Sequence, residues 1–218
     1  MSDRLLRLLH GAATGAPPAA DGVVEVWPAP AGAVDAVLAF TAHHVVVAGV
    51  EPDLVAARLP EGDLTAPMSP GFLGWLGQEL GSLPGSLDVV LAARGLGGEP
   101  PLELRAGVDP DRHPRAARAL RYRGDLEVWT APDGAGVLVL GRGLAGRREV
   151  SFEVDPGRRN RGLGRLLVAA ARHLTPPDEP LFAQVAPGNA ASLRVVEAAG
   201  FRPIGAEVLF HGDGADPN

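Results

Sequence analysis

The chain has 218 residues, 46% of them hydrophobic, and its 26 acidic residues outnumber its 20 basic residues. This length allows one large domain or two small ones, with enough apolar residues for a substantial buried core. The net charge of −6 disfavours non-specific binding to nucleic acid, which needs a basic surface. The absence of cysteine excludes disulfides, thiolate metal ligands and a cysteine acyl-enzyme. We therefore expect a soluble globular protein.

The first 22 residues are predicted to form a flexible N-terminal segment. Residues up to about His10 suit one or two amphipathic helical turns, and residues 11–22 are rich in Gly, Ala and Pro, as is typical of a linker. Arg4 and Arg7 interrupt the apolar residues that a signal peptide would keep continuous, and no apolar run reaches the length of a membrane span. We expect a cytoplasmic protein without a membrane partner.

Residues 23–100 are predicted to form an N-terminal α/β region. Ser69 is the expected N-cap of one of its helices, because its side chain can accept a hydrogen bond from the first helical turn. The expected strands cover residues 23–27, 44–47 and 87–93, and the expected helices cover residues 34–40, 52–59 and 70–81.

Residues 101–210 are predicted to form a second domain, followed by a disordered tail at 211–218. Pro132-Asp133-Gly134 has the composition of a tight turn, so the apolar runs on either side of it predict a hairpin. The expected elements are strands at 102–105, 126–130, 137–140, 148–154, 181–185 and 207–210, and helices from Asp109 to about 120, from the glycine-rich turn to about 174, and from Asn189 to Gly200.

The most informative motif follows the strand that ends at Val154. It runs from Arg159 to Arg165, and its two glycines, Gly162 and Gly164, allow a ligand to approach the backbone where a helix begins. The N-terminus of that helix presents unpaired N–H groups and the positive end of its dipole. Guanidinium groups that suit phosphate oxygens crowd the same turn, at Arg158, Arg159, Arg161 and Arg165. The pattern predicts a pyrophosphate site.

The motif does not match two other known classes of glycine-rich turn that bind phosphate groups. The dinucleotide fingerprint requires a third glycine where this chain has Leu167. The phosphate loop of nucleotide triphosphatases requires a lysine, and every basic residue of this chain is an arginine.

With Asn189 and Ser192 at the start of the next helix and Gly200-Phe201 at its end, the motif resembles the acyl-CoA-binding half of the GNAT superfamily of N-acyltransferases. The resemblance covers about residues 102–210. It implies an α/β (α+β) fold with a mixed, mostly antiparallel central sheet flanked by helices. Residues 23–100 are unmatched; one interpretation is a degenerate GNAT-like half with a structural role, and catalytic and binding roles stay open.

The resemblance also implies acetyl-CoA as the acyl donor and no metal. In that family the glycine-rich turn holds the CoA pyrophosphate, and the preceding strand hydrogen-bonds the pantetheine arm. Asn189 and Gln184 are expected beside that arm, although Asn189 and Ser192 equally suit a helix cap. The cofactor-binding residues implied are Val154, Arg159, Asn160, Arg161, Gly162, Leu163, Gly164, Arg165, Asn189 and Ser192.

Glu149 and Glu153 are the candidate general bases, because relatives often carry a glutamate on the corresponding strand. Their other interpretation is a solvated strand face. Many relatives carry a tyrosine as the general acid at the position that Val196 occupies here. The leaving thiolate can depart without an acid, since the pKa of a thiol is only about 8.5.

The function predicted from these residues is an acyl-CoA-dependent N-acetyltransferase that moves an acetyl group to a primary amine of a small molecule by direct transfer. The alternative is a non-catalytic acyl-CoA-binding module with a sensing or scaffolding role. Either protein is expected to be a monomer or a homodimer that does not bind nucleic acid. His43 and His44 lie on opposite faces of a predicted strand, so they cannot both ligate one metal without distortion.

Overall fold

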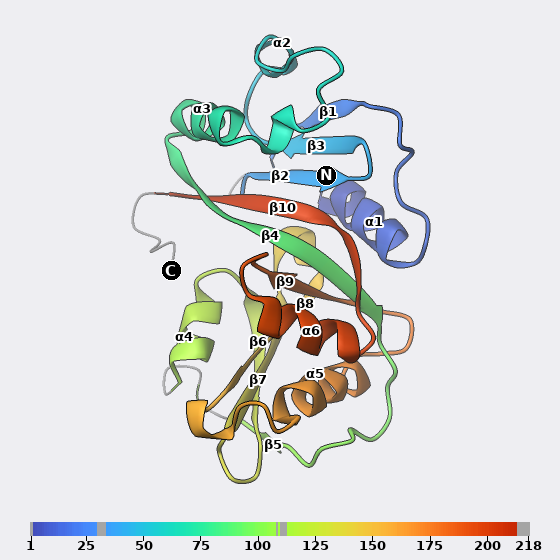
Figure 1. Ribbon diagram of the computed structural model, residues 1–218, viewed down its shortest axis with the longest axis vertical. Coiled ribbons are helices and arrows are strands. Elements are labelled where there is room, and N and C mark those ends of the chain that lie inside the picture. Colours follow the sequence, from blue (N-terminus) through green and yellow to red (C-terminus); the bar gives the residue numbers. More distant parts are fainter. Residues whose placement is uncertain (1, 30–33, 108, 110–112, 213–218) are drawn as a thin grey trace. The chain divides into compact units, whose positions relative to one another are not determined.

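The computed structural model describes residues 2–29, 34–107, 109 and 113–212. The chain divides into two compact units, Met1–Val90 with Ile204–Asn218, and Leu91–Pro203. It passes from one unit to the other within strand β4 (Ser82–Arg94) and within strand β10 (Arg202–Gly212). The fold is α/β with mostly antiparallel strands, as predicted (Figure 1).

The unit boundaries differ from the predicted division at 100/101. Residues just after Arg94 hydrogen-bond within the second unit: the Gly95 amide donates to the Glu179 carbonyl at 3.0 Å, and the Leu96 amide donates to the Arg172 carbonyl at 2.7 Å. Most of β10, which the predicted domain 101–210 included, belongs to the first unit. Of the predicted tail, residues 211 and 212 lie in β10, and residues 213–218 lie outside the described part of the chain.

The first unit is built on strands in the order β1-β3-β2-β10-β4. β1 (Val24–Trp27) is parallel to β3 (His43–Val47), whereas β2 (Ala36–Phe40) is antiparallel to β3 and to β10. Its helices are α1 (Ser2–Ala13), α2 (Pro52–Ala56) and α3 (Pro70–Leu80), with a 3-10 turn at Ala66–Met68.

An apolar core joins α3 to one face of these strands. Phe72 and Leu76 of α3 pack with Val37 of β2, Val46 of β3 and Val208 of β10. The helix begins as predicted, since the Ser69 hydroxyl accepts a hydrogen bond from the Phe72 amide at 3.2 Å. It ends at Gly81, whose φ of 61° lies in the left-handed region that favours glycine.

Two predictions for this unit are wrong. Residues 34–40 were expected to be helical, but Ala36–Phe40 form the strand β2, which is paired on both sides. A short apolar run does not distinguish a helix from a buried strand, and neighbouring strands decide the outcome. Helix α1 reaches Ala13, past the expected one or two turns, because Leu5, Leu9 and Ala12 form a helical stripe that is buried.

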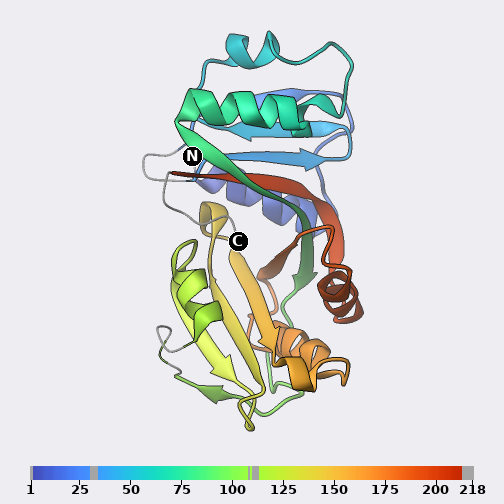
Figure 2. The same ribbon diagram turned by 60° about the vertical axis from the view of Figure 1, so that its left-hand side comes forward.

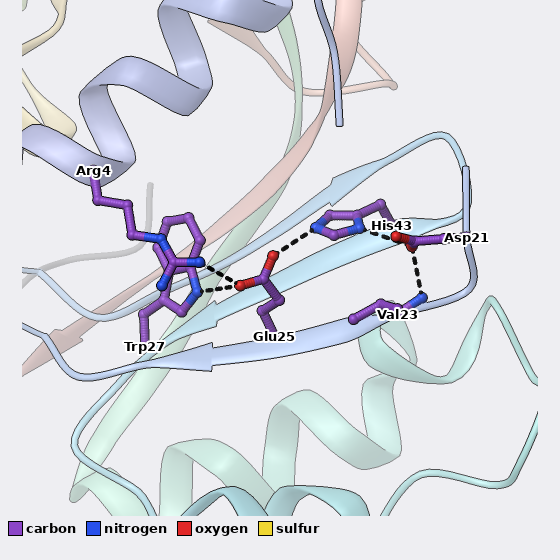
Figure 3. Close-up of polar contacts among 6 residues, drawn as sticks. All are labelled: Arg4, Asp21, Val23, Glu25, Trp27 and His43. Carbon is purple, nitrogen blue, oxygen red and sulfur yellow. Dashed lines mark hydrogen bonds and ion pairs between the residues drawn. The ribbon is translucent and has the colours of Figure 1, made fainter. Parts of the chain in front are cut away.

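Polar contacts also join α1 to β1 and β3 (Figure 3). The Arg4 guanidinium lies over the Trp27 ring, 3.9 Å from its centroid, and donates to Glu25 Oε2 at 2.6 Å. Asp21 Oδ1 and Glu25 Oε1 lie 3.0 Å and 3.4 Å from the two ring nitrogens of His43. The hydrogen bond from His43 is the main cause that lowers the pKa of Asp21. We conclude that His43 has a structural partner on each side.

The second unit is built on strands in the order β4-β9-β8-β7-β6-β5. Its strands are β5 (Arg105–Ala106), β6 (Gly124–Thr130), β7 (Gly136–Arg142), β8 (Arg148–Val154) and β9 (Pro180–Val185). Its helices are α4 (Pro114–Leu120), α5 (Leu163–His173) and α6 (Ala190–Ala198), with 3-10 turns at Leu144–Gly146 and Pro156–Arg158.

Helices α4 and α5 cover opposite faces of strands β6 to β8 (Figures 1 and 2). On one face, Ala116 and Ala119 of α4 pack on Val128 and Val139. On the other face, a Cβ on Gly136 of β7 would overlap with Leu167 of α5, so glycine allows this helix to approach the strands closely. The predicted hairpin is confirmed as β6 and β7.

Two elements of this unit differ from prediction. The strand expected at 102–105 is reduced to Arg105–Ala106, and the helix expected from Asp109 begins only at Pro114. His113, whose Nδ1 accepts from the Arg115 amide at 3.2 Å, caps that helix in place of Asp109. Residues 108 and 110–112 of the expected elements lie outside the described part. Among the residues described in both units, no helix has both the length and the apolar composition to cross a bilayer.

Candidate functional site

Strands β8 and β9 are parallel and pair only where they begin. The paired residues are Arg148 with Leu181 and Glu149 with Phe182. β8 then continues to Val154 while paired with β7 on its other side. Along this length β8 has no pairing with β9, so part of its backbone N–H and C=O groups remain available to another partner.

The turn after β8 brings the backbone into left-handed conformations at two positions. Asn160 has a φ of 60° and Gly162, the N-cap of α5, has a φ of 83°. No side chain caps this helix, so the first N–H groups of α5 have no partner from a capping side chain. A Cβ built on Gly162 would meet no heavy atom within 4 Å, so backbone conformation and not packing requires glycine here.

Gly164, unlike Gly162, lies against neighbouring side chains. A Cβ at this position would lie 3.2 Å from Phe152 Cε2, 3.5 Å from Val195 Cγ1 and 3.7 Å from Val154 Cγ2. The second glycine therefore allows α5 to pack closely against β8 and α6. The sequence did not distinguish this helix packing from close approach of a ligand.

The arginines of the turn are not equivalent. Arg158 donates to Asp133 Oδ2 at 2.7 Å and so joins the turn to the β6–β7 hairpin. Arg159 folds back and donates from Nε to the Val154 carbonyl at 3.0 Å, which ties two predicted cofactor residues to each other. Arg161 and Arg165 are exposed, which leaves their side chains accessible to an anion.

Asn189 is the N-cap of α6. Its Oδ1 accepts a hydrogen bond from the Ser192 amide at 3.1 Å, so this one contact accounts for both residues. Their contact with a pantetheine arm remains a prediction. Val196 of the same helix is 1% exposed and belongs to the core, so the position at which relatives carry a catalytic tyrosine holds a buried apolar side chain.

Glu149 is buried between two arginines and does not lie on a solvated face. Arg123 Nε donates to its Oε2 at 2.6 Å and Arg147 Nε to its Oε1 at 2.7 Å. Gly143 makes room for this carboxylate, since a Cβ there would overlap with it. Burial alone would raise the pKa of Glu149, but the charges of Arg147 and Arg123 outweigh burial and lower it. A carboxylate stabilised in this way is a poor base.

Glu153 lies on the same face of β8 as Glu149, in a different environment. Its side chain is 43% exposed, and its Oε2 lies 3.6 Å from Nε of Arg115 on α4, beyond hydrogen-bond distance. Of the two candidate bases, Glu153 is therefore accessible and loosely paired, whereas Glu149 is buried and tightly paired.

Arg123 also orients a residue on β9. Its Nη2 donates to Gln184 Oε1 at 3.0 Å, so the amide nitrogen of Gln184 faces the other way. That Nε2, and Ser151 Oγ on β8, are buried without a hydrogen-bond partner among the described residues. Sequence reasoning missed Arg123 and Arg147, since neither belongs to a motif and only the fold places them at Glu149. No group of three or more His, Asp or Glu side chains suited to a metal occurs in the described part of the chain.

The comparisons with known proteins match part of the chain. Residues 150–210 match the family model described as FR47-like protein, which is related to the GNAT superfamily. No curated protein matches the chain.

Several solved structures are similar to part of this chain. A GCN5-related N-acetyltransferase from Kribbella flavida is 18% identical, with a TM-score of 0.43 over 66% of this chain and 65% of its own. One from Sphaerobacter thermophilus is 18% identical, with a TM-score of 0.39 over 65% of this chain and 56% of its own. An acetyltransferase of the GNAT family from Colwellia psychrerythraea is 9% identical, with a TM-score of 0.42 over 63% and 60%.

This chain thus spans less than two thirds of each of these three structures, and the likenesses are partial. The assignment rests on the matched segment, which begins in β8 and includes the glycine-rich turn, α5, β9, α6 and most of β10. Residues 150–210 of this chain are thus similar to an FR47-like family that is related to the GNAT superfamily.

Proposed function

We propose that the chain is an acyl-CoA-dependent N-acetyltransferase that transfers an acetyl group from acetyl-CoA directly to a primary amine of a small molecule. The observation that carries this proposal is the short pairing of β8 with β9, directly followed by the uncapped N-terminus of α5. A strand with available backbone groups suits an amide-containing arm, and a helix N-terminus suits a pyrophosphate.

The residues of the turn fit acetyl-CoA. Gly162 faces open space, and the exposed Arg161 and Arg165 flank it with positive charge. In this proposal the backbone from Arg159 to Arg165 holds the pyrophosphate, and β8 up to Val154 holds the pantetheine arm. Bound acetyl-CoA supplies the acetyl group as an activated thioester.

Glu153 is the proposed general base. An amine attacks only in its unprotonated form, so a nearby carboxylate must accept a proton from the ammonium group, directly or through water. Glu153 is accessible for this role, whereas both oxygens of Glu149 accept hydrogen bonds from arginine. The buried Val196 cannot donate a proton, so the thiolate leaves without an acid from that position.

Isothermal titration with acetyl-CoA and with free CoA tests the proposed binding site. In Gly162→Val we expect saturable binding to be lost, because a β-branched residue disfavours a φ of 83° and its side chain occupies the open space of the turn. Gly157→Val is the matched control, since Gly157 also faces open space in this turn but has no positive φ. A melting curve confirms that both variants fold. Wild-type affinity in folded Gly162→Val would contradict the site.

The alternative function is a non-catalytic acyl-CoA-binding module, and the buried Val196 in place of a catalytic tyrosine favours it. Thiol release from acetyl-CoA, measured with a panel of amines, separates the two functions. Release above the chemical background that falls strongly in Glu153→Gln supports the enzyme. Release that is unchanged in that variant removes Glu153 as the base.

A further inference from the structure

The inference concerns the acceptor and rests on the proposed function. We propose that Arg115 and Glu153 recognise a zwitterionic amino acid as the acceptor, with its carboxylate on Arg115 and its ammonium group on Glu153. The two side chains carry opposite charges, come from α4 and β8, and lie on the α4 face of the strands.

The first observation is that this ion pair is loose where its neighbours on β8 are tight. Glu149 and Arg148 form ion pairs at distances of 2.6 to 2.7 Å, whereas Arg115 Nε and Glu153 Oε2 are 3.6 Å apart. The Arg115 Nε atom is buried without a hydrogen-bond partner among the described residues. A buried N–H group without an acceptor is unfavourable, so this atom favours a ligand that accepts a hydrogen bond from it.

The second observation is that both side chains are accessible, 36% exposed for Arg115 and 43% for Glu153. A ligand can therefore reach each of them. In an α-amino acid, one carbon separates the ammonium group from the carboxylate. A cation and an anion placed next to each other on the protein are complementary to that arrangement.

The third observation is the charge around Arg115. Burial is the main cause that lowers the pKa of Arg115. Glu153 raises this pKa, whereas Arg118 and Arg123 lower it further. Arg123 and Arg147 together carry one positive charge more than Glu149, which they share. The described residues on this face thus favour a ligand that brings a negative charge, and partial burial of Arg115 strengthens that pairing.

The fourth observation is Ser151, which lies between Glu149 and Glu153 on the same face of β8. Its Oγ is buried without a hydrogen-bond partner in the described part of the chain. When the acceptor carboxylate takes over Arg115, Glu153 is released from its ion pair and can accept the proton of the ammonium group.

The test compares twenty α-amino acids with their α-carboxamides, which keep the amine and the side chain but remove the negative charge. Binding of each pool to the wild-type protein is measured by saturation-transfer NMR, and N-acetyl products are identified by mass spectrometry with acetyl-CoA present. We expect binding and products in the amino-acid pool, with kcat/KM for the best acid roughly tenfold or more above its amide.

Arg115→Gln should abolish this preference while acetyl-CoA still binds, and Arg121→Gln, an exposed arginine at the end of the same helix, should keep it. Amides that bind and react as well as the acids would overturn the proposal, as would the absence of product from every amino acid. In both cases retained titration with acetyl-CoA leaves the acyl-CoA site intact, whereas loss of that titration contradicts the proposed function itself.

Discussion

Glu149 and Glu153 show how neighbouring residues of one type acquire different roles. They are two positions apart on one strand and face the same side, so the sequence treats them alike. The structure separates them, because Arg123 and Arg147 enclose Glu149 while Glu153 has only the loose contact with Arg115. The difference arises from side chains outside the strand.

Glu149→Gln is expected to lower the free energy of unfolding by about 3 kcal/mol, because it leaves two arginines without their shared carboxylate. Urea denaturation measures this change. Glu153→Gln should cost less than about 1 kcal/mol, since its ion pair is exposed. A stability loss in Glu153→Gln as large as that in Glu149→Gln would contradict this assignment of roles.

His44 makes the first unit sensitive to pH. Burial lowers the pKa of its imidazole and the adjacent His43 lowers it further. The unfolded chain, with a pKa near 6.5, therefore binds the proton more readily, so the stability present above that pH is lost as the pH falls through the folded-state pKa. We expect Tm to fall from about pH 7.5 to about pH 5.5, and to fall less in His44→Leu, as measured by circular dichroism. An equal decrease in both proteins would exclude His44 as the cause.

Among the elements, two helix caps were predicted correctly, whereas the cap expected at Asp109 and one short apolar run were not. Ser69 and Asn189 both cap helices as predicted, since the cap depends on contacts within four residues. Residues 36–40 became a strand against prediction, because their pairing with β3 and β10 involves distant parts of the chain. Helix α1 is also longer than predicted, because its length depends on the burial of Leu5 and Leu9 against other parts of the chain.

Ser69→Ala is expected to lower the free energy of unfolding by about 1 kcal/mol, because the Phe72 amide loses its acceptor. The measurement is chemical denaturation followed by far-UV circular dichroism. Ser86→Ala is the control, since Ser86 is exposed and makes only a 3.4 Å contact with Asp88. If both variants lose the same stability, the cap does not stabilise α3.

On the scale of the molecule, the second unit begins at Leu91, before the domain division at 100/101 that the sequence predicts. Arg94, Gly95 and Leu96 are joined to α5 and to the residues before β9 by backbone hydrogen bonds and by Arg172 Nε, which donates to the Arg94 carbonyl at 3.1 Å. A domain division drawn from the sequence at 100/101 removes these contacts.

A fragment of residues 91–203 is therefore expected to be more stable than a fragment of residues 101–203. The longer fragment keeps the last part of β4 and its hydrogen bonds with α5 and the β9 region. Thermal melts of both fragments measure the difference. Equal melting temperatures would show that the unit does not depend on residues 91–100.

The sequence by itself determined the features that depend on residues close together in the chain: the hairpin turn, the caps at Ser69 and Asn189, the strand that carries both glutamates, and the glycine-rich turn before α5. Backbone conformation and local hydrogen bonding decide these features. Only the tertiary structure decided that Gly164 packs against β8, that Glu149 is buried between Arg123 and Arg147, and that Arg115 faces Glu153. Those contacts join residues far apart in sequence. Their energies depend on burial, which cannot be read from a local sequence pattern.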